Sequence, residues 1–260
     1  LIAENVKLTK NQKFLEFDGM WSSSLTDSTI RGKPDNQAVD YSTRITGLNE
    51  ILDVTSKPVI FDADNGGRIE HLQYLVKTLE RVGVSAIVLE DKIGLKKNSL
   101  FKNQVGVKQD SIENFCMKLK KAKESKISDD LFIVARIESF ILGKGLKDAM
   151  RRAEAYSRSG ADAIVIHSKE KYPNQIFSFS KNFIKSKFSK PLIAIPSTYS
   201  KTYESELINN GFKIVIYANH FLRTIHPAMV NVAKMILKNQ RSFEAEKKMS
   251  SIKEVINLVQ

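Results

Sequence analysis

The chain has 260 residues, with 41 Lys and Arg against 29 Asp and Glu, which gives a formal net charge of +12. Its 42% hydrophobic and 27% charged residues exclude a disordered chain, and its single cysteine, Cys116, excludes a disulfide framework. No apolar run approaches the roughly 20 residues of a membrane span, and the opening residues lack a signal peptide, so we expect a cytoplasmic protein without a membrane segment.

Short apolar runs recur along the chain, and amphipathic stretches follow most of them. Continuous Val, Ile, Leu and Ala without polar alternation predict strands buried on both faces, as in a parallel sheet covered by helices. Seven such strands are expected, over residues 14–21, 58–64, 85–91, 131–138, 161–168, 191–197 and 213–219.

Helical spacing of apolar residues predicts helices between these strands, and glycines mark several of their ends. The clearest helices are expected over residues 69–82, 111–123, 146–157, 226–239 and 252–259, with a polar connector over 240–250. Repeated strand–helix alternation predicts a parallel α/β fold, a (β/α)8 barrel. Because only seven strands are counted and LIAENVKL resembles the end of a helix, we expect the first strand upstream of Leu1. The expected division is a barrel domain over 1–239 and a connector with a helix over 240–260.

Carboxylates follow two neighbouring strands of the predicted barrel. Asp62 and Asp64 point to the same side of their strand, because side-chain direction repeats every two residues, and Glu90 ends the next strand. Such a cluster needs a cation, and oxygen ligands without His or Cys favour Mg²⁺ or Mn²⁺. The alternative is that the Asp-x-Asp segment only caps an element.

Cationic and polar groups face the same rim. Arg136 interrupts an apolar strand, and its guanidinium suits a carboxylate or phosphate, or else a structural pair with Glu138. His167 ends the fifth strand, where it either donates to a phosphoryl oxygen or caps the strand. The loop over 94–108 is long and basic, which is typical of a lid or of a solvated surface. The serines after Trp21 suit a carboxylate, or form a polar turn.

Five segments in this order resemble the phosphoenolpyruvate mutase/isocitrate lyase superfamily: DGMWSSSLTDSTIRGKPD, DADNGG, LEDKIGLKKNSL, VARIESF and GADAIVIHSK. The resemblance runs from about Leu1 to the final SIKEVINL. It implies a (β/α)8 barrel that interconverts phosphoenolpyruvate and 3-phosphonopyruvate, an isomerase reaction of phosphonate biosynthesis that uses Mg²⁺ and a small anionic substrate. It also implies a homo-oligomer, a dimer or tetramer, in which the C-terminal helix crosses to a neighbour.

The resemblance also implies a role for individual residues. The Mg²⁺ ligands would be Asp62 directly and Asp64, Glu90 and Asp35 through water. The pyruvate part of the substrate would bind Arg136, Ser23 and the backbone N–H groups of Ser24 and Leu25, with Trp21 as a wall. The phosphoryl group would bind Asn98, Arg136 and His167. The lid would contain Lys96, Asn98 and Ser99, and Ser99 and Leu100 would also bind the substrate.

Three alternatives are compared with this assignment. Phosphonopyruvate hydrolase shares the barrel and metal site, and the Lys-x-Asn-Ser loop favours the mutase over it. The superfamily's lyases carry a catalytic Cys in a Lys-x-Cys-Gly-His segment, whereas this loop reads Lys96-Lys97-Asn98-Ser99, so a lyase is not expected. A basic nucleic-acid-binding module would explain the charge of +12, but no nucleic-acid-binding motif is present and aromatic residues do not interleave with the basic runs, so no nucleic acid is expected as a partner.

Overall fold

A computed structural model describes residues 1–94, 96–101 and 103–259, and the chain divides into two compact units. The larger unit comprises Asp18–Asp53 and Lys57–Ala218. The smaller unit comprises Leu1–Phe17, Val54–Ser56 and Asn219–Gln260. This grouping differs from the expected boundary at residue 239, and that boundary stays a prediction.

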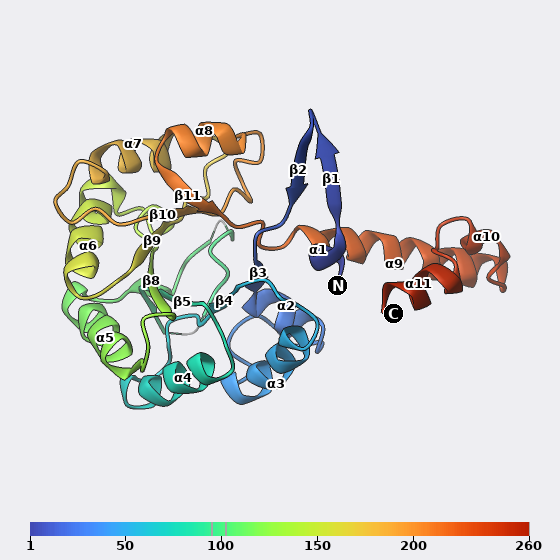
Figure 1. Ribbon diagram of the computed structural model, residues 1–260, viewed down its shortest axis with the longest axis horizontal. Coiled ribbons are helices and arrows are strands. Elements are labelled where there is room, and N and C mark those ends of the chain that lie inside the picture. Colours follow the sequence, from blue (N-terminus) through green and yellow to red (C-terminus); the bar gives the residue numbers. More distant parts are fainter. Residues whose placement is uncertain (95, 102, 260) are drawn as a thin grey trace. The chain divides into compact units, whose positions relative to one another are not determined.

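The larger unit is built on a curled parallel sheet of seven strands (Figure 1). The order in the sheet is β3-β4-β5-β8-β9-β10-β11, and each neighbouring pair is parallel. The predicted α/β class and parallel sheet are therefore confirmed, whereas an eighth strand stays a prediction. The strands are β3 (Met20–Ser22), β4 (Val59–Asp62), β5 (Ala86–Glu90), β8 (Phe132–Ile137), β9 (Ala163–Ile166), β10 (Leu192–Ala194) and β11 (Phe212–Val215).

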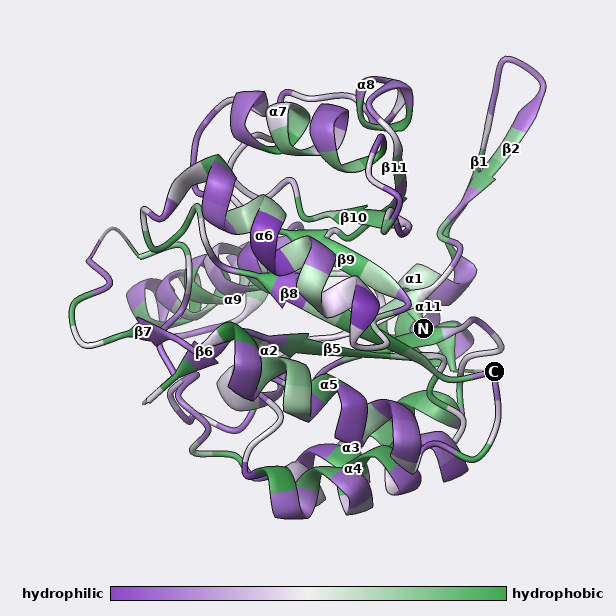
Figure 2. Ribbon diagram, turned by 90° about the vertical axis from the view of Figure 1, so that its left-hand side faces the viewer, coloured by the Kyte–Doolittle hydropathy of each residue, from purple (hydrophilic) through white to green (hydrophobic). Residues whose placement is uncertain are grey.

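Helices cover the outside of this sheet (Figure 1). Figure 2 shows apolar strands in the interior and hydrophilic outer surfaces on many of the surrounding helices, as amphipathic sequences require. Gly83, Gly160 and Gly211, which follow three of the helices, have positive φ angles of 95°, 103° and 86°, a conformation that favours glycine. The helices are α2 (Ser24–Thr29), α3 (Tyr41–Leu52), α4 (Ile69–Arg81), α5 (Ile112–Ser125), α6 (Gly145–Arg158), α7 (Asn174–Phe183) and α8 (Glu204–Asn209).

Alternate residues of each strand face two different cores. Ile87 and Leu89 of β5 belong to the larger cluster, which includes buried residues of the helices, whereas Ala86 and Val88 belong to the cluster on the opposite face of the sheet. We call this second cluster, on the inside of the curled sheet, the inner cluster. The same period of two holds in β8, where Val134 belongs to the inner cluster. Polar residues that continue the inner series therefore point into the curl where the strands end. They are Asp62 and Asp64, Glu90 and Lys92, Arg136 and Glu138, and His167.

The smaller unit contains a hairpin that was not expected. β1 (Lys7–Lys10) pairs antiparallel with β2 (Lys13–Glu16), and Asn11 and Gln12 form its turn with φ angles of 50° and 61°. The single strand expected over 14–21 is therefore wrong. Its first part pairs within the hairpin, whereas Met20–Ser22 pairs with β4.

The rest of the smaller unit is helical. It contains α1 (Ile2–Asn5), α9 (His220–Asn239), α10 (Phe243–Glu246) and α11 (Ile252–Leu258), so a short helix interrupts the expected polar connector. Phe17 and Phe221 stack edge to face with ring centroids 6.1 Å apart. Among the described residues, no helix is both long and apolar enough to cross a bilayer.

Candidate active site

The carboxylates predicted at the ends of β4 and β5 are buried inside the curl. Asp62, Asp64 and Glu90 are 8%, 4% and 4% exposed. The Ser24 hydroxyl donates to Asp62 Oδ2 at 3.0 Å, and the Asp64 backbone N–H donates to Asp62 Oδ1 at 3.2 Å. Asp64 has a φ of 50°, a left-handed conformation that is uncommon for a residue with a side chain. The chain therefore turns sharply at Asp64 and brings both carboxylates to one place.

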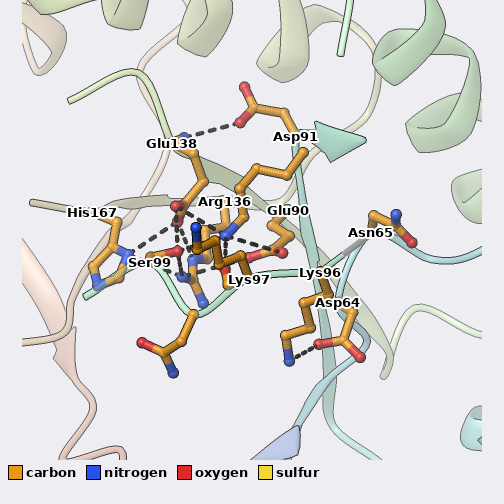
Figure 3. A network of polar contacts seen from close by, with 12 residues as sticks. Asp64, Asn65, Glu90, Asp91, Lys96, Lys97, Ser99, Arg136, Glu138 and His167 are labelled. Atoms are coloured by element: carbon orange, nitrogen blue, oxygen red, sulfur yellow. Dashed lines mark hydrogen bonds and ion pairs between the residues drawn. The ribbon is translucent and has the colours of Figure 1, made fainter. Parts of the chain in front are cut away.

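The ammonium of Lys96 lies among the acidic groups. It forms an ion pair with Asp64, is 2.7 Å from Asp35 Oδ1 and donates to the Ser24 hydroxyl (Figure 3 for Lys96 and Asp64). Arg44 Nη1 lies 3.6 Å from the other oxygen of Asp64. The structure thus brings together four of the residues assigned by the resemblance: Ser24, Asp35, Asp64 and Lys96.

Burial raises the pKa of two of these carboxyls above the ordinary value. Burial and then the charge of Asp62 raise the pKa of Asp64. Burial also raises the pKa of Glu90, to about 7, despite the opposing charges of Lys92 and Arg136. Burial acts in the same direction on Asp62, but Lys96, Arg136 and Arg44 together hold the pKa of Asp62 below its ordinary value.

Three buried carboxyl groups, two of them with raised pKa values, fit a hard divalent cation. Within the described ranges, no three or more His, Cys, Asp or Glu side chains are arranged as ligands around one point. Asp62, Asp64 and Glu90 therefore stay a predicted ligand set.

Arg136 occupies the centre of a second, adjoining network. Its Nε lies 2.6 Å from Glu138 Oε1, and its Nη2 lies 3.5 Å from Glu90 Oε2. Nη2 also donates to the Ser99 hydroxyl at 3.0 Å and lies 2.9 Å from His167 Nδ1 (Figure 3). The structural pair with Glu138 therefore forms, and it fixes the plane of a guanidinium that also contacts Ser99 and His167.

Burial favours the neutral form of His167. Burial and then the charge of Arg136 lower the pKa of His167, which more than offsets the nearby carboxylate of Glu138. His167 Nδ1 lies 3.0 Å from Glu138 Oε1. In the neutral tautomer in which Nδ1 accepts from Arg136 Nη2, the N–H donor is on Nε2, where it can donate to a phosphoryl oxygen.

The loop over 94–108 begins and ends in a two-stranded ladder. β6 (Lys92–Ile93) pairs antiparallel with β7 (Lys108–Gln109). Asn98 is half-buried, and its side-chain oxygen accepts from the Leu100 N–H at 3.0 Å. Its amide is therefore oriented by the loop itself, and no contact of that side chain with Arg136 or His167 is found.

The remaining predicted residues lie around α2. Ser23 precedes this helix and accepts from the Thr26 N–H at 3.4 Å, so its hydroxyl caps the helix. Trp21 is partly buried against the inner cluster, and Leu25 lies in the first turn. The first N–H groups of α2 have no partner within the helix and suit an anion.

Two buried residues of this site were not assigned to it from the sequence: Lys92 was given no role, and Glu138 was considered only as a structural partner of Arg136. Lys92 is 4% exposed and contacts Glu90 and Glu138, and Glu138 is fully buried against Arg136 and His167. The signal was present in the LEDK and VARIE segments, because charged residues that continue an apolar strand in its inward register need buried partners.

Asp91, next to these groups, points outward to α6. Asp91 Oδ2 accepts from the Tyr156 hydroxyl at 2.8 Å and lies 3.2 Å from Arg152 Nη1. Asp91 Oδ1 accepts from the Glu138 backbone N–H at 2.9 Å. This outer network therefore fixes the backbone that carries Glu138.

Some of the lysines that suggested a nucleic-acid surface are used within the fold. On α5, Lys118 donates to the Asn65 carbonyl at 2.9 Å and Lys123 lies 2.6 Å from Asp162. Leu119 and Ala122, between them, are buried in the larger core. Cys116 of the same helix is partly buried against that core, as expected for a packing residue.

Comparison with known proteins agrees with this geometry. The family model described as phosphoenolpyruvate phosphomutase matches residues 3–237. A phosphoenolpyruvate phosphomutase of Tetrahymena pyriformis is 36% identical over 93% of this chain and 80% of its own length. A phosphonopyruvate hydrolase of Variovorax sp. (strain Pal2) is 33% identical over 99% of this chain and 88% of its own length.

Solved structures of a mutase and of a hydrolase resemble this chain to a similar degree. The phosphoenolpyruvate phosphomutase of Streptomyces platensis subsp. rosaceus superposes with a TM-score of 0.87 at 32% identity, over 93% of this chain and 83% of that one. A phosphonopyruvate hydrolase bound to oxalate and Mg²⁺ superposes with a TM-score of 0.83 at 33% identity, over 93% of this chain and 82% of that one.

Proposed function

This chain belongs to the phosphoenolpyruvate phosphomutase family, within the phosphoenolpyruvate mutase/isocitrate lyase superfamily of enzymes, and from that premise we propose that it interconverts phosphoenolpyruvate and 3-phosphonopyruvate. The curled seven-stranded sheet is consistent with the TIM-like barrel of that superfamily. Sequence identity to the mutases and to the hydrolase is similar, so identity does not distinguish the two reactions. The choice between them therefore depends on the arrangement of the site.

The proposed cofactor is Mg²⁺, with Mn²⁺ as a substitute. Asp62, Asp64 and Glu90 would hold it, together with Asp35, because all four are carboxylate oxygen donors. A cation would also favour the charged forms of Asp64 and Glu90, whose pKa values are raised. When bound, the metal neutralises charge on the enolpyruvate oxygens. A phosphonopyruvate hydrolase of the family binds Mg²⁺, which supports this assignment.

The chain's own groups would hold the two ends of the substrate. The N–H groups of Ser24 and Leu25 and the hydroxyl of Ser23 suit the carboxylate, and Trp21 lines that side. Arg136, His167 and Asn98 suit the phosphoryl oxygens. In phosphoenolpyruvate the O–P bond breaks and a C3–P bond forms, so the phosphoryl group must stay held between the two events.

Exclusion of water then separates the mutase from its runner-up, a phosphonopyruvate hydrolase. In the hydrolase reaction water attacks phosphorus, the C3–P bond breaks, and C3 takes a proton to give pyruvate. The observation that supports the mutase best is the position of Ser99, which is 3% exposed and bound to Arg136 and Glu138, so that this part of the loop covers the site.

A ³¹P NMR experiment with phosphonopyruvate and Mg²⁺ tests this proposal. A mutase converts the phosphonate signal into that of phosphoenolpyruvate. A hydrolase gives inorganic phosphate and pyruvate instead, and that result would replace the proposed reaction. An unchanged phosphonate signal would contradict both activities.

We expect the substitution Asn98→Ala to abolish mutase turnover and to leave Mg²⁺ binding intact. The reason is that the amide would hold the phosphoryl group, whereas Asn98 is not among the predicted metal ligands. Turnover is measured by ³¹P NMR and Mg²⁺ affinity by calorimetry. Normal turnover in this variant would rule out the assigned role of Asn98.

The smaller unit supports a homo-oligomer, a dimer or tetramer. The 20-residue helix α9 contains no buried residue, and α11 contains none either. Apolar side chains are exposed on both, among them Phe221, Met229, Leu237 and Ile252. We therefore propose that these helices, including the C-terminal helix over 252–258, pack against a second copy. Light scattering on the full chain measures the number of subunits.

A further inference from the structure

Lys92 is a buried cation to which no role has been assigned above. Its side chain is 4% exposed and enters the site from the inward face just after β5. Glu90 Oε1 lies 3.5 Å from its Nζ and Glu138 Oε2 lies 3.6 Å away, so two strand-end carboxylates supply the charge that a buried ammonium needs.

The shorter contacts of Lys92 are with the loop and not with the strands. Its Nζ donates to the Ser99 hydroxyl at 2.7 Å and to the Lys97 carbonyl at 2.9 Å. Its hydrogen bonds therefore link the start of the loop to the segment that carries Lys96, Asn98 and Ser99. Charge-assisted bonds of this kind are stronger than neutral ones, and burial strengthens them further.

Ser99 connects Lys92 to the hydrogen-bond network around Arg136. Its hydroxyl accepts from Lys92 and from Arg136 and donates to Glu138 Oε2 at 2.5 Å (Figure 3 for Ser99, Arg136 and Glu138). The ladder of β6 and β7 fixes the ends of the loop but does not reach Ser99. In the described part of the loop, the position of the segment 96–101 over the site therefore depends on the contacts of Ser99 and Lys92, together with the ion pairs of Lys96 with Asp35 and Asp64.

We infer that Lys92 is a positioning residue that holds the loop segment 96–101 closed, and that it thereby sets how much of the phosphoryl group is transferred to carbon and how much to water. The effect on the product ratio rests on the proposed mutase function, whereas the hydrogen bonds from Lys92 to the loop do not depend on it. Loss of the link would open the segment, admit water to phosphorus and increase the release of phosphate relative to isomerisation.

The test compares Lys92→Met with Lys97→Met. Methionine preserves most of the length of the side chain without its charge, and the Lys97 side chain is a matched control because only its backbone carbonyl bonds to Lys92. Two quantities are measured: amide hydrogen exchange of Ser99, Leu100 and Phe101, and the ratio of phosphate to phosphoenolpyruvate formed from phosphonopyruvate with Mg²⁺. We expect Lys92→Met to raise both by about tenfold or more, and Lys97→Met to change neither.

A second variant separates positioning from general damage to the fold. Ser99→Ala removes the far end of the link, so it should raise the same ratio, and the double variant should add little to Lys92→Met alone. Where Lys92→Met does not fold by circular dichroism, the single variant Ser99→Ala decides. The inference would be overturned if Lys92→Met had reduced turnover but the same product ratio and the same amide exchange as the unaltered chain. If the unaltered chain forms no phosphoenolpyruvate, the proposed function fails, and the exchange measurement still decides whether Lys92 holds the segment.

Discussion

Replacement of Arg136 by methionine is expected to lower turnover by more than about a thousandfold, because one preorganised donor alone is worth about 10²–10³ and this guanidinium also orients others. Its Nη2 contacts Ser99 and His167, and its Nε binds Glu138. The substitution removes the phosphoryl-binding group and leaves Glu138 with less positive charge around it. Turnover of phosphonopyruvate measured by ³¹P NMR gives the effect.

Two further variants show what the loss of Arg136 means. Arg136→Lys keeps a charge but not the planar fork, so it should stay far below the unaltered chain. Arg151→Met, which removes a cation whose side chain is 70% exposed, should leave turnover unchanged. Turnover of Arg136→Met within tenfold of the unaltered chain would contradict the assigned role.

Replacement of Arg152 by methionine is expected to lower the free energy of unfolding by about 3–5 kcal/mol, the range for breaking a buried ion pair. Arg152 binds both Asp91, which is fully buried, and Asp148 Oδ2 at 2.8 Å. Without it the donors to Asp91 among the described residues are neutral groups, such as the Tyr156 hydroxyl and the Glu138 backbone N–H. Urea unfolding followed by circular dichroism measures the loss. Arg151→Met is the control and should cost less than about 1 kcal/mol.

The loss in Arg152→Met should also depend on pH. Burial already raises the pKa of Asp91 to about 6, and Arg152 opposes that rise. Without the arginine the folded-state pKa is higher still, so the folded chain keeps a proton that the unfolded chain releases. Stability of the variant therefore falls as pH increases above the ordinary range of an aspartate, and the deficit should be larger at pH 8 than at pH 5. A deficit independent of pH would contradict the pairing of Asp91 with Arg152.

The sequence was sufficient to predict most of the larger unit. Continuous apolar runs predicted six of the seven parallel strands, and for the first strand only its end, Met20–Ser22, joins the sheet. Strands covered on both faces need no polar alternation. The period of two along a strand placed Asp62 and Asp64 on the same side, and the structure confirms that both are buried. The hairpin of β1 and β2 was missed because both of its four-residue strands are exposed and half of their residues are charged, and Phe14 and Leu15 were counted with the strand that follows.

What the sequence determined by itself was which residues end the strands and in which register they point, since both follow from local periodicity. Only the tertiary structure decided how charges pair. Lys96, which lies in a loop, forms ion pairs with Asp35 and Asp64. Lys92 donates to Ser99, and Glu138 forms an ion pair with Arg136. Pairing depends on how far each long side chain extends and on how much charge its neighbours leave uncompensated after burial, and neither quantity is encoded in the spacing of residues along the chain.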